Sequence, residues 1–554
     1  MKKKILCLSL AVLMIAASFV GCGKKDKATF MIEQGMENSK EAVTITMYVL
    51  AESKVHADQE ARVENAANLI LDPYKIKLDL KYFTEDEYYT TLETNLAEMK
   101  AHSGETRETE APVYTDENGI PKTYYPPNEE YQVDVFYFSG YDRYKKYSSE
   151  GYLADFSKEL TENATELKDG ISSVLYESVN TVNGKYDMMP VNTAVGEYTY
   201  MLVSKEILKS ENLSTDNVGT LVSSSCADLL ASVKKYYPDY VPLYSSEGVL
   251  AFDDVKFFGT AANGYASDEF SILAGTYNDS WTYGKKNEYP VMSGINATVE
   301  NGNPTVIEQI KRLKSYEFNG YYPTDDNMDK PFAVGYFKGT SEIVDKYSED
   351  YEVVVLDTPT LTTEALYENV IALSKENTSL KASARVLSEL YTNEELINVL
   401  AHGVEGENYI DATPAGSTAK VIKPQAKDER FVYDIDINKV ANTSKVYPTV
   451  DEDPARCERI RSQNADAKAD LLLGYTLYGS SKLDAMKSIN EYSAAAYAKI
   501  LAAKNEAELD AVLADIAKTV EGDDVKKIFA GGGVYDEYMK WLTANKIYVT
   551  EEKK

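Results

Sequence analysis

Few residues in this chain have the types and spacing that catalysis or metal binding requires. The three histidines, His56, His102 and His402, are scattered, and neither an H-E-x-x-H motif nor a pair of neighbouring cysteines accompanies them. The sequence therefore gives no support for a zinc site. It also contains no G-x-S-x-G nucleophile elbow. A glycosidase pair among the 89 acidic residues stays an open alternative, because the required carboxylate separation is spatial.

Two further motifs fail at required positions. Asp325, Asn327 and Asp329 have the spacing of a calcium-binding loop, but Lys330 replaces the loop glycine and Tyr336 replaces the twelfth-position acid. The three glycines at 531–533 are not followed by Lys and Ser or Thr, so they predict a helix connector and not a phosphate loop. We expect neither a metal nor a cofactor.

The N-terminus carries the one cysteine with an evident chemical role. Three lysines precede an apolar run at residues 5–20, which predicts a secretory signal. The run ends in Phe-Val-Gly-Cys, which resembles a bacterial lipobox. We expect residues 1–21 to be removed, Cys22 to carry acyl chains such as palmitate, and residues 22–42 to form a polar spacer. Plain secretion and an uncleaved anchor are the alternatives. Cys226 and Cys457 either pair in this oxidising compartment or stay buried as thiols.

Composition narrows the function. A formal charge of −31 repels phosphate backbones and excludes nucleic acid as a partner. A length of 554 residues exceeds the ~100–200 residues of one average domain, so we expect two lobes. Tyrosine is abundant, with 44 residues against 15 phenylalanines. Flat apolar rings rimmed by hydroxyls suit sugars, although we expect most of these rings to pack half-buried.

The periodicity of the chain predicts an α/β fold. Residues 42–50 and 74–83 alternate as strands, and 58–71 and 85–101 have helical apolar stripes. This alternation indicates a parallel sheet covered by helices. Further along, we expect a surface insertion at 102–130, a strand at 133–140, a second α/β region at 205–352, a strand at 351–359, helices at 380–392 and 394–402, and mostly helix from 454.

Several segments, in order, resemble one known family: the extracellular solute-binding lipoproteins of ABC importers, in the branch that captures sugars and oligosaccharides in anaerobic Gram-positive bacteria. They are spread over residues 43–548 and include ITMYVLAES, FTEDEYYTTLETNL, QVDVFYFSGYDRYKKYSSEGYLADF, VNGKYDMMPVNTAVGEYTYMLVSKEIL, FAVGYFKGTSEIVDKYSEDYEVVVLDTP, LYTNEELINVLAHGVEGENYI, NKVANTSKVYP and VYDEYMKWLTAN.

The resemblance implies a two-lobed binding-protein fold (type II) that holds carbohydrate in a central cleft and closes by a hinge motion. It assigns 43–200 and 355–412 to lobe 1, and 203–352 and 413–554 to lobe 2. It implies a non-enzymatic monomer that is lipid-anchored on the outer face of the membrane and delivers its ligand to ABC permease subunits.

The same resemblance nominates ligand-binding residues. Glu52 follows the first strand, and Ser139, Gly140 and Tyr141 end the strand FYF. Carboxylates and amides bind hydroxyls, and rings stack on sugars. The remaining candidates are Asn192, Glu197, Tyr198, Trp281, Tyr283, Tyr336 and Phe337. For each, packing or solvation is the alternative to ligand contact. The sequence reads Asp187-Met188-Met189 where the family often has Ala-Ile, and this departure leaves the local packing there open.

Three other functions stay open. A peptide-binding or sensor lipoprotein would have the same fold with a different ligand. A surface glycosidase would release products from oligosaccharides. An adhesion lipoprotein would show no saturable affinity for a small ligand.

Overall fold

The structure is a computed structural model, and it describes residues 42–103, 113–115, 121–123, 131–252, 255–260, 264, 266–267, 269–276, 292–296, 305–417, 419–425, 432–433, 435–439, 441–477 and 479–544. The predicted signal, the spacer and Cys22 lie outside these residues. So do most of the predicted insertion at 102–130 and the candidates Trp281 and Tyr283.

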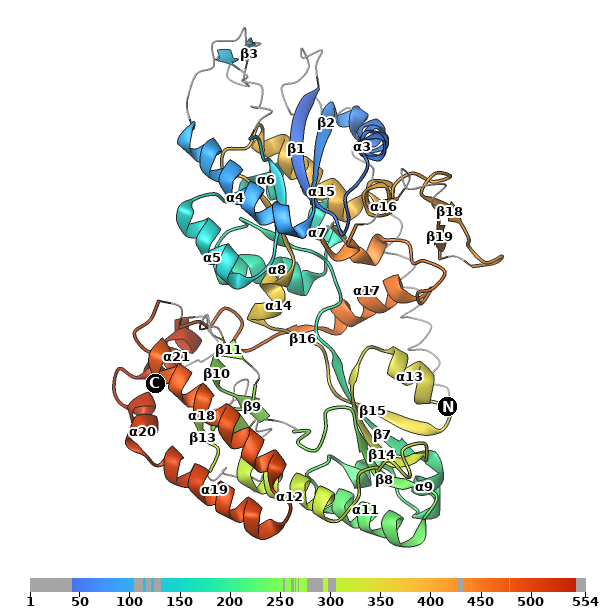
Figure 1. Ribbon diagram of the computed structural model, residues 1–554, viewed down its shortest axis with the longest axis vertical. Helices are drawn as coiled ribbons and strands as arrows, with labels where there is room; N and C mark the ends of the chain where they lie inside the picture. Colours follow the sequence, from blue (N-terminus) through green and yellow to red (C-terminus); the bar gives the residue numbers. More distant parts are fainter. Residues whose placement is uncertain are drawn as a thin grey trace, which may run out of the picture. The chain divides into compact units, whose positions relative to one another are not determined.

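Contacts divide the chain into two compact units (Figure 1). Unit 1 comprises the described residues of Met1–Tyr137, Glu150–Gly170 and Ile371–Val450, and unit 2 those of Phe138–Ser149, Ile171–Val370 and Asp451–Lys554. This grouping differs from the predicted lobe boundaries at 138–149, 171–200 and 355–370, which join unit 2, and at 413–450, which joins unit 1. The later stretch joins unit 1 because Ile422–Pro424 pairs with Tyr409–Asp411.

The first sheet has five strands in the order β2 (Ile76–Phe83), β1 (Val43–Leu50), β5 (Val135–Phe138), β17 (Val370–Leu373) and β6 (Met189–Pro190). β1 runs parallel to β2 and to β5. Six of the eight residues of β1 are buried, whereas β2 alternates at its start, as expected for a central strand and its edge neighbour. The predicted parallel arrangement of these strands is confirmed.

Two helices cover β1 and β2. α3 (Ala57–Leu71) begins after His56, whose Nδ1 accepts a hydrogen bond from the Asp58 amide at 3.2 Å. α4 (Glu85–Ala101) begins with three acidic residues that favour the positive end of the helix dipole. Its buried residues Tyr88, Leu92, Leu96 and Met99 recur at helical spacing. Both helices occur where the sequence predicted them.

The buried carboxylate of Asp134 joins three elements of unit 1. It accepts hydrogen bonds from the Thr46 amide in β1 at 2.7 Å, from the Gln132 side chain at 2.8 Å, and from the Thr378 amide. Ser374 donates to the carbonyl of Asp134, and Gly140 donates to the carbonyl of Tyr367. These two bonds show that β17 runs antiparallel to β5.

The helices α15 (Leu380–Thr392) and α16 (Glu394–His402) have the bounds that the sequence predicted. Asn393 separates them: it ends α15, and its side-chain oxygen accepts the Leu396 amide at 3.2 Å to begin α16. The other elements that lie in unit 1 are β3 (Val113–Thr115), β4 (Pro121–Thr123), η1 (Asp72–Tyr74), α6 (Ser157–Glu162), α7 (Leu167–Gly170), β18 (Tyr409–Asp411), β19 (Ile422–Pro424), η3 (Ile437–Lys439) and η4 (Thr443–Lys445).

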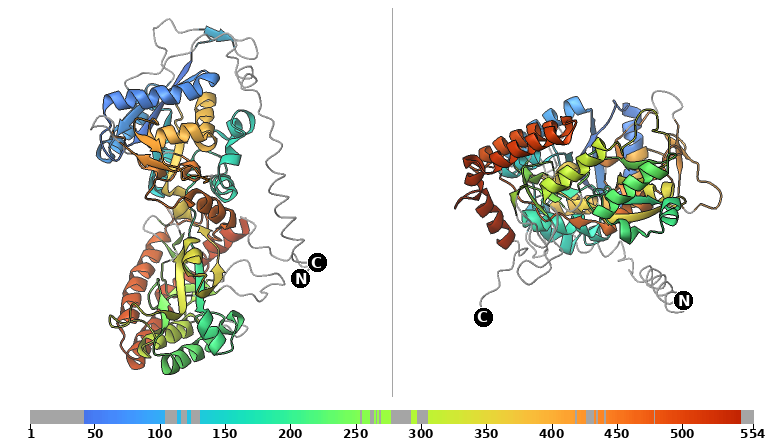
Figure 2. Two further views of the ribbon diagram at one scale, coloured as in Figure 1. Left: turned by 90° about the vertical axis from the view of Figure 1, so that its right-hand side faces the viewer. Right: turned by 90° about the horizontal axis from the view of Figure 1, so that it is seen from below.

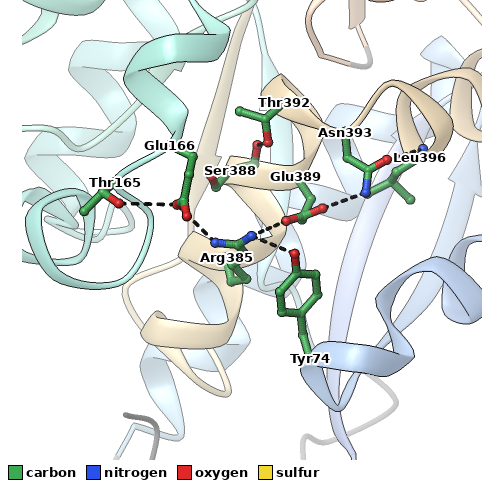
Figure 3. A network of polar contacts seen from close by, with 9 residues as sticks. All are labelled: Tyr74, Thr165, Glu166, Arg385, Ser388, Glu389, Thr392, Asn393 and Leu396. Carbon is green, nitrogen blue, oxygen red and sulfur yellow. Dashed lines mark hydrogen bonds and ion pairs between the residues drawn. The ribbon is translucent and has the colours of Figure 1, made fainter. Parts of the chain in front are cut away.

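A buried charged network fastens α15 to its neighbours. Figure 3 shows the Arg385 guanidinium between Glu166 and Glu389, with the Tyr74 hydroxyl beside it. Arg385 donates to Glu166 at 3.2 Å, to the Tyr74 hydroxyl at 2.8 Å, and to Glu389 one turn along the helix. The side chain of Arg385 is 9% exposed and that of Glu389 is 4% exposed. Little water therefore reaches either charge if its partner is removed.

The second sheet lies in unit 2, with the strand order β15 (Tyr351–Asp357), β7 (Tyr198–Ser204), β14 (Phe332–Gly339) and β8 (Val241–Ser245). β7 is antiparallel to β15 and to β14, and β8 is parallel to β14. The carboxyl ends of β8, β14 and β15 therefore lie beside the start of β7, along the edge of the sheet that the strand ends form. Below, this edge is called the carboxyl edge of the second sheet.

Helices dominate unit 2 after residue 454, as predicted. α18 (Leu483–Ala502) packs against α19 (Glu506–Val520), and α20 (Asp523–Phe529) packs against α21 (Val534–Ala544) (Figures 1 and 2). The other elements in or bordering unit 2 are α5 (Tyr141–Glu150), α8 (Ser173–Asn183), α9 (Lys205–Ser210), α10 (Thr215–Val218), α11 (Ser224–Tyr236), β9 (Val255–Phe257), β10 (Gly259–Thr260), β11 (Ala266–Ser267), β12 (Leu273–Thr276), β13 (Ser293–Gly294), α12 (Val306–Phe318), α13 (Glu342–Tyr347), β16 (Thr360–Leu361), α14 (Thr363–Glu368), α17 (Arg456–Asp466) and β20 (Lys468–Ala469).

The α/β fold class is confirmed by these two helix-covered sheets. No disulfide joins Cys226 and Cys457, and Cys226 is buried in α11. Among the residues that the structure describes, no helix combines the length and apolar composition needed to cross a bilayer. Within the same residues, no three His, Cys, Asp or Glu side chains gather in a way that could hold a metal ion.

The Arg385 network predicts a large and specific loss of stability. Arg385→Ala leaves the Glu389 carboxylate buried without its cation, which should lower the free energy of unfolding by about 3–5 kcal/mol in urea denaturation. Arg461→Ala is the control: its ion pair with Glu458 is exposed on both sides and should contribute less than about 1 kcal/mol. A cost for Arg385→Ala as small as that of the control would show that the buried network does not stabilise the unit.

Candidate functional site

The turn after β5 places Ser139, Gly140 and Tyr141 at the carboxyl end of a parallel strand. β5 is fully buried and ends at Phe138, and α5 begins at Tyr141. Gly140 has φ +96°, which disfavours any other residue, and a Cβ added there would meet no atom within 4 Å. Its amide donates to the carbonyl of Tyr367 at 2.7 Å. The turn is thus fixed by its backbone and lies beside open space.

Tyr141 belongs to a cluster of three tyrosines with Tyr144 and Tyr367. The ring centroids of Tyr141 and Tyr144 lie 5.1 and 4.7 Å from that of Tyr367. Tyr141 and Tyr144 are each 7% exposed, and Tyr367 is fully buried. This packing leaves Tyr141 little surface to offer a ligand, and it indicates a supporting role beneath the Ser139–Gly140 turn.

Asp187 lies against this tyrosine cluster. Its carboxylate accepts hydrogen bonds from the Tyr144 hydroxyl at 3.3 Å and the Asn183 side chain at 3.2 Å, and Lys185 pairs with it at 3.0 Å. Burial raises the pKa of Asp187, and the contacts with Lys185 and Tyr144 partly oppose that rise. The departure from the family pattern at residue 187 thus introduces a buried acid.

Asn192 begins a stretch, residues 191–198, that leads from β6 to β7; residues 191–197 form neither helix nor strand. Its side-chain oxygen accepts hydrogen bonds from the Ser172 amide at 3.3 Å and from Asn464 Nδ2 at 3.1 Å. Asn192 is 5% exposed. Its oxygen is therefore engaged within the protein.

The helix α17 contacts the rest of this stretch. Asn464 accepts the Val195 amide at 2.8 Å and donates to the Thr193 carbonyl at 2.7 Å. Gln463 donates to the carbonyls of Val195 and Gly196 at 3.3 and 2.6 Å. These bonds pair backbone groups of residues 193–196, which belong to no strand, and below they are called the α17 contacts.

Glu197 and Tyr198 lie at the carboxyl edge of the second sheet, where β7 begins. The Tyr198 hydroxyl donates to Asp466 at 2.7 Å, and Tyr198 is 7% exposed. Burial, and then this hydrogen bond, raise the pKa of the Tyr198 hydroxyl. Glu197 is exposed. Gly196 precedes it with φ +56°, and a Cβ there would lie 2.8 Å from the Thr360 backbone.

The other sequence candidates lie elsewhere. Glu52 is half-exposed after β1 in unit 1 and pairs with Lys439 at 3.3 Å. Tyr336 is 2% exposed in β14, and its hydroxyl donates to the Phe252 carbonyl at 3.3 Å. Phe337 packs against Tyr244 with ring centroids 5.2 Å apart. This burial favours packing for Tyr336 and Phe337.

A hollow of about 380 Å³ lies beside the end of β8, where its lining residue Ser245 pairs with Tyr336 of β14. It is lined by Ser245, Gly248, Val249, Glu317, Gly320, Tyr322, Pro323 and Thr324. The lining combines the ring of Tyr322, the carboxylate of Glu317 and three hydroxyl groups, those of Ser245, Tyr322 and Thr324. Rings, carboxylates and hydroxyl groups are suited to binding a sugar, but the sequence analysis nominated none of these lining residues.

The candidate residues thus fall into two groups in the structure. The sequence did not reveal the residues that pack against these groups or form hydrogen bonds with them. Asn192, Glu197 and Tyr198 lie on one stretch that α17 contacts, and Ser139, Gly140 and Tyr141 form one turn. The partners Tyr367, Gln463, Asn464 and Asp466 were not nominated. The only sign of them in the sequence is the run of polar residues in α17. Such a run is also typical of an exposed surface helix, so it does not indicate that an amide is buried.

The fold is that of the two-lobed solute-binding proteins of ABC transporters, and several of the solved structures that resemble this chain are described as sugar- or oligosaccharide-binding proteins. The N-glycan transport solute-binding protein NgtS of Streptococcus pneumoniae has 16% sequence identity and a TM-score of 0.52, over 90% of this chain and 99% of that chain. This likeness establishes the fold.

Two further structures are similar over most of the chain. A solute-binding protein from Bifidobacterium longum infantis that binds human milk oligosaccharides has 14% identity over 91% of this chain and 96% of that chain, with a TM-score of 0.37. A Streptococcus pneumoniae substrate-binding protein in complex with kestose has 12% identity over the same shares, with a TM-score of 0.34. No family model matches the sequence, and no curated protein matches it.

The buried acid predicts a pH dependence of stability. Since the folded-state pKa of Asp187 lies above its unfolded value, its contribution is present below pH ~4 and is lost as pH rises through the folded-state pKa. Compared with Asp187→Asn, the wild type should lose unfolding free energy as pH rises from 3.5 to 7. The exposed Asp228→Asn controls for the change in net charge. An unchanged difference between wild type and Asp187→Asn across this range would contradict the prediction.

Proposed function

We propose that this protein is the extracellular binding component of an ABC importer, which captures an oligosaccharide without catalysis and delivers it to a membrane permease. The fold carries this proposal, because it is shared over nearly the whole chain with a protein whose stated role is N-glycan transport. Fold alone does not define a ligand, so the surface chemistry of unit 2 supplies the second support.

That surface offers groups suited to sugar hydroxyls and ring faces. Glu197 is exposed at the carboxyl edge of the second sheet, and Gly140 lies beside open space after β5. Binding sites of α/β sheets lie outside the carboxyl ends of strands. We propose that Glu197, Ser139, Gly140 and Glu52 contact ligand, and that Trp281 and Tyr283 add stacking faces.

The buried candidates have a different role in this proposal. The side chains of Tyr141, Asn192, Tyr198, Tyr336 and Phe337 belong to residues at most 7% exposed. A ligand could use little of their surface, so we propose that they support the contacting residues. The hollow beside β8, with Tyr322 and Glu317 in its lining, is a further surface on which one sugar unit could bind.

The proposal also places the protein in the cell. Removal of residues 1–21 and acylation of Cys22 would hold a monomer at the outer face of the membrane, with permease subunits as partners. Two or more acyl chains make such an anchor durable, at ~0.8 kcal/mol per buried CH₂.

Oligosaccharide binding should stabilise the folded protein. Thermal unfolding of the purified protein with mannosyl-GlcNAc glycans, human milk oligosaccharides, kestose and control peptides should show a shift with one glycan class. Ligand at a hundredfold excess over Kd adds ~2.7 kcal/mol of stability. A shift with peptides alone would favour the peptide-binding alternative, and release of shortened glycans would favour a glycosidase.

Glu197 should contribute directly to affinity. Glu197→Gln removes a charged acceptor whose hydrogen bonds to sugar hydroxyls contribute about 1.5–3 kcal/mol, so affinity should fall about 10- to 100-fold in titration calorimetry. Glu352→Gln is the matched control, an exposed glutamate on β15 that pairs with Val203 near the far end of β7. Equal affinity in wild type and Glu197→Gln would remove Glu197 from the binding surface.

The lipid anchor depends on one thiol. Cells that express the wild type with labelled palmitate should yield a labelled protein in the membrane fraction, and Cys22→Ser should abolish the label. Cys226→Ser controls for the loss of a thiol, because Cys226 is buried in unit 2. A label that persists in Cys22→Ser would exclude lipidation at this residue.

A further inference from the structure

The 191–198 stretch is held near both ends and in its middle by side chains of α17, of which Gln463 and Asn464 are buried and Asp466 is exposed. Asn192 at its start receives Asn464, and Tyr198 at its end donates to Asp466. Between them, the α17 contacts reach the backbone of Thr193, Val195 and Gly196. Three side chains at positions 463, 464 and 466 of one helix thus bond to five of the seven residues from Asn192 to Tyr198.

Burying the polar side chains of Gln463 and Asn464 costs free energy, and an apolar helix face would avoid that cost. Gln463 is 2% exposed and Asn464 is 3% exposed, and a buried amide is tolerated only when its polar atoms are paired. An apolar helix face would bury α17 more simply. The amides are used instead to pair backbone groups, because an amide both donates and accepts.

The residue that follows these contacts is the exposed Glu197. Its backbone is bounded by Gly196, packed against Thr360, and by Tyr198, the first residue of β7. The backbone position of Glu197, and with it the direction of its Cα–Cβ bond, is therefore held before any ligand arrives. Fixing a binding group in advance raises affinity by avoiding the ordering cost at the moment of binding.

We propose that Asn464 and Gln463 are positioning residues for carbohydrate binding: through the backbone of residues 193–196 they preset Glu197, without touching the ligand themselves. This inference rests on the proposed function and deepens it, because it identifies what sets the geometry of the binding surface. It assigns a role to α17, a helix in which sequence analysis nominated no residue.

The first test needs no ligand. Hydrogen exchange of the free protein should show slow exchange at the Val195 amide, which donates to Asn464, and faster exchange there in Asn464→Ala. Asn490→Ala is the matched control, since Asn490 contacts the amide, carbonyl and hydroxyl of Thr260 in the same unit. Fast exchange at Val195 in the wild type would overturn the proposal whatever the protein binds.

The second test separates positioning from general support of the fold. Affinity for the glycan that stabilises the wild type is measured for Asn464→Ala, Glu197→Gln and the double variant. If Asn464 acts through Glu197, the Glu197→Gln loss should be at least about fivefold smaller in the Asn464→Ala background. Asn490→Ala should leave that loss unchanged.

Each outcome of these affinity measurements either supports or overturns the positioning role of Asn464. Wild-type affinity in folded Asn464→Ala overturns the proposal, and so do losses that simply multiply in the double variant, because a structural role alone predicts independent effects. If Asn464→Ala does not fold, Gln463→Ala enters the same cycle with the same expectation. A wild type that binds no carbohydrate refutes the proposed function, while the exchange at Val195 still decides whether α17 presets the stretch.

Discussion

Residues 192–197 form no strand, and the candidate surface proposed here depends on how their backbone polar groups are paired. An unpaired buried amide or carbonyl costs about as much as a lost hydrogen bond. Gln463 and Asn464 supply partners for the backbone of Thr193, Val195 and Gly196. These bonds hold the backbone that leads into Glu197 and β7.

Elsewhere in the chain, buried charged side chains also join separate segments through hydrogen bonds. Asp134 joins β1 to the residues before α15, and Arg385 joins α15 to η1 and to Glu166. Such groups are weak evidence for net stability, but their directional bonds are satisfied in only one arrangement. Asp187 does the same beneath the Ser139–Gly140 turn. The surfaces proposed to meet ligand thus rest on interior polar contacts and not on apolar packing alone.

The sequence predicted the regular elements well but not the long-range contacts of the candidate site residues, for a physical reason. Alternation and helical stripes are local, so 85–101, 380–392 and 394–402 could be located to the residue. The bond from Tyr198 to Asp466 spans 268 positions, and no local pattern reports it. In β14, periodicity cannot distinguish an aromatic that faces a ligand from one that faces the core. Tyr336 and Phe337 were nominated by family resemblance, and both are buried.

Hydrogen exchange of the wild type, with and without a saturating oligosaccharide, tests the central claim most directly. The account predicts added protection in the turn after β5 and at Glu197 and Tyr198. It predicts little change at Val195, whose amide is already paired in the free protein. Protection elsewhere with none at these residues, or no protection by any glycan, would contradict it.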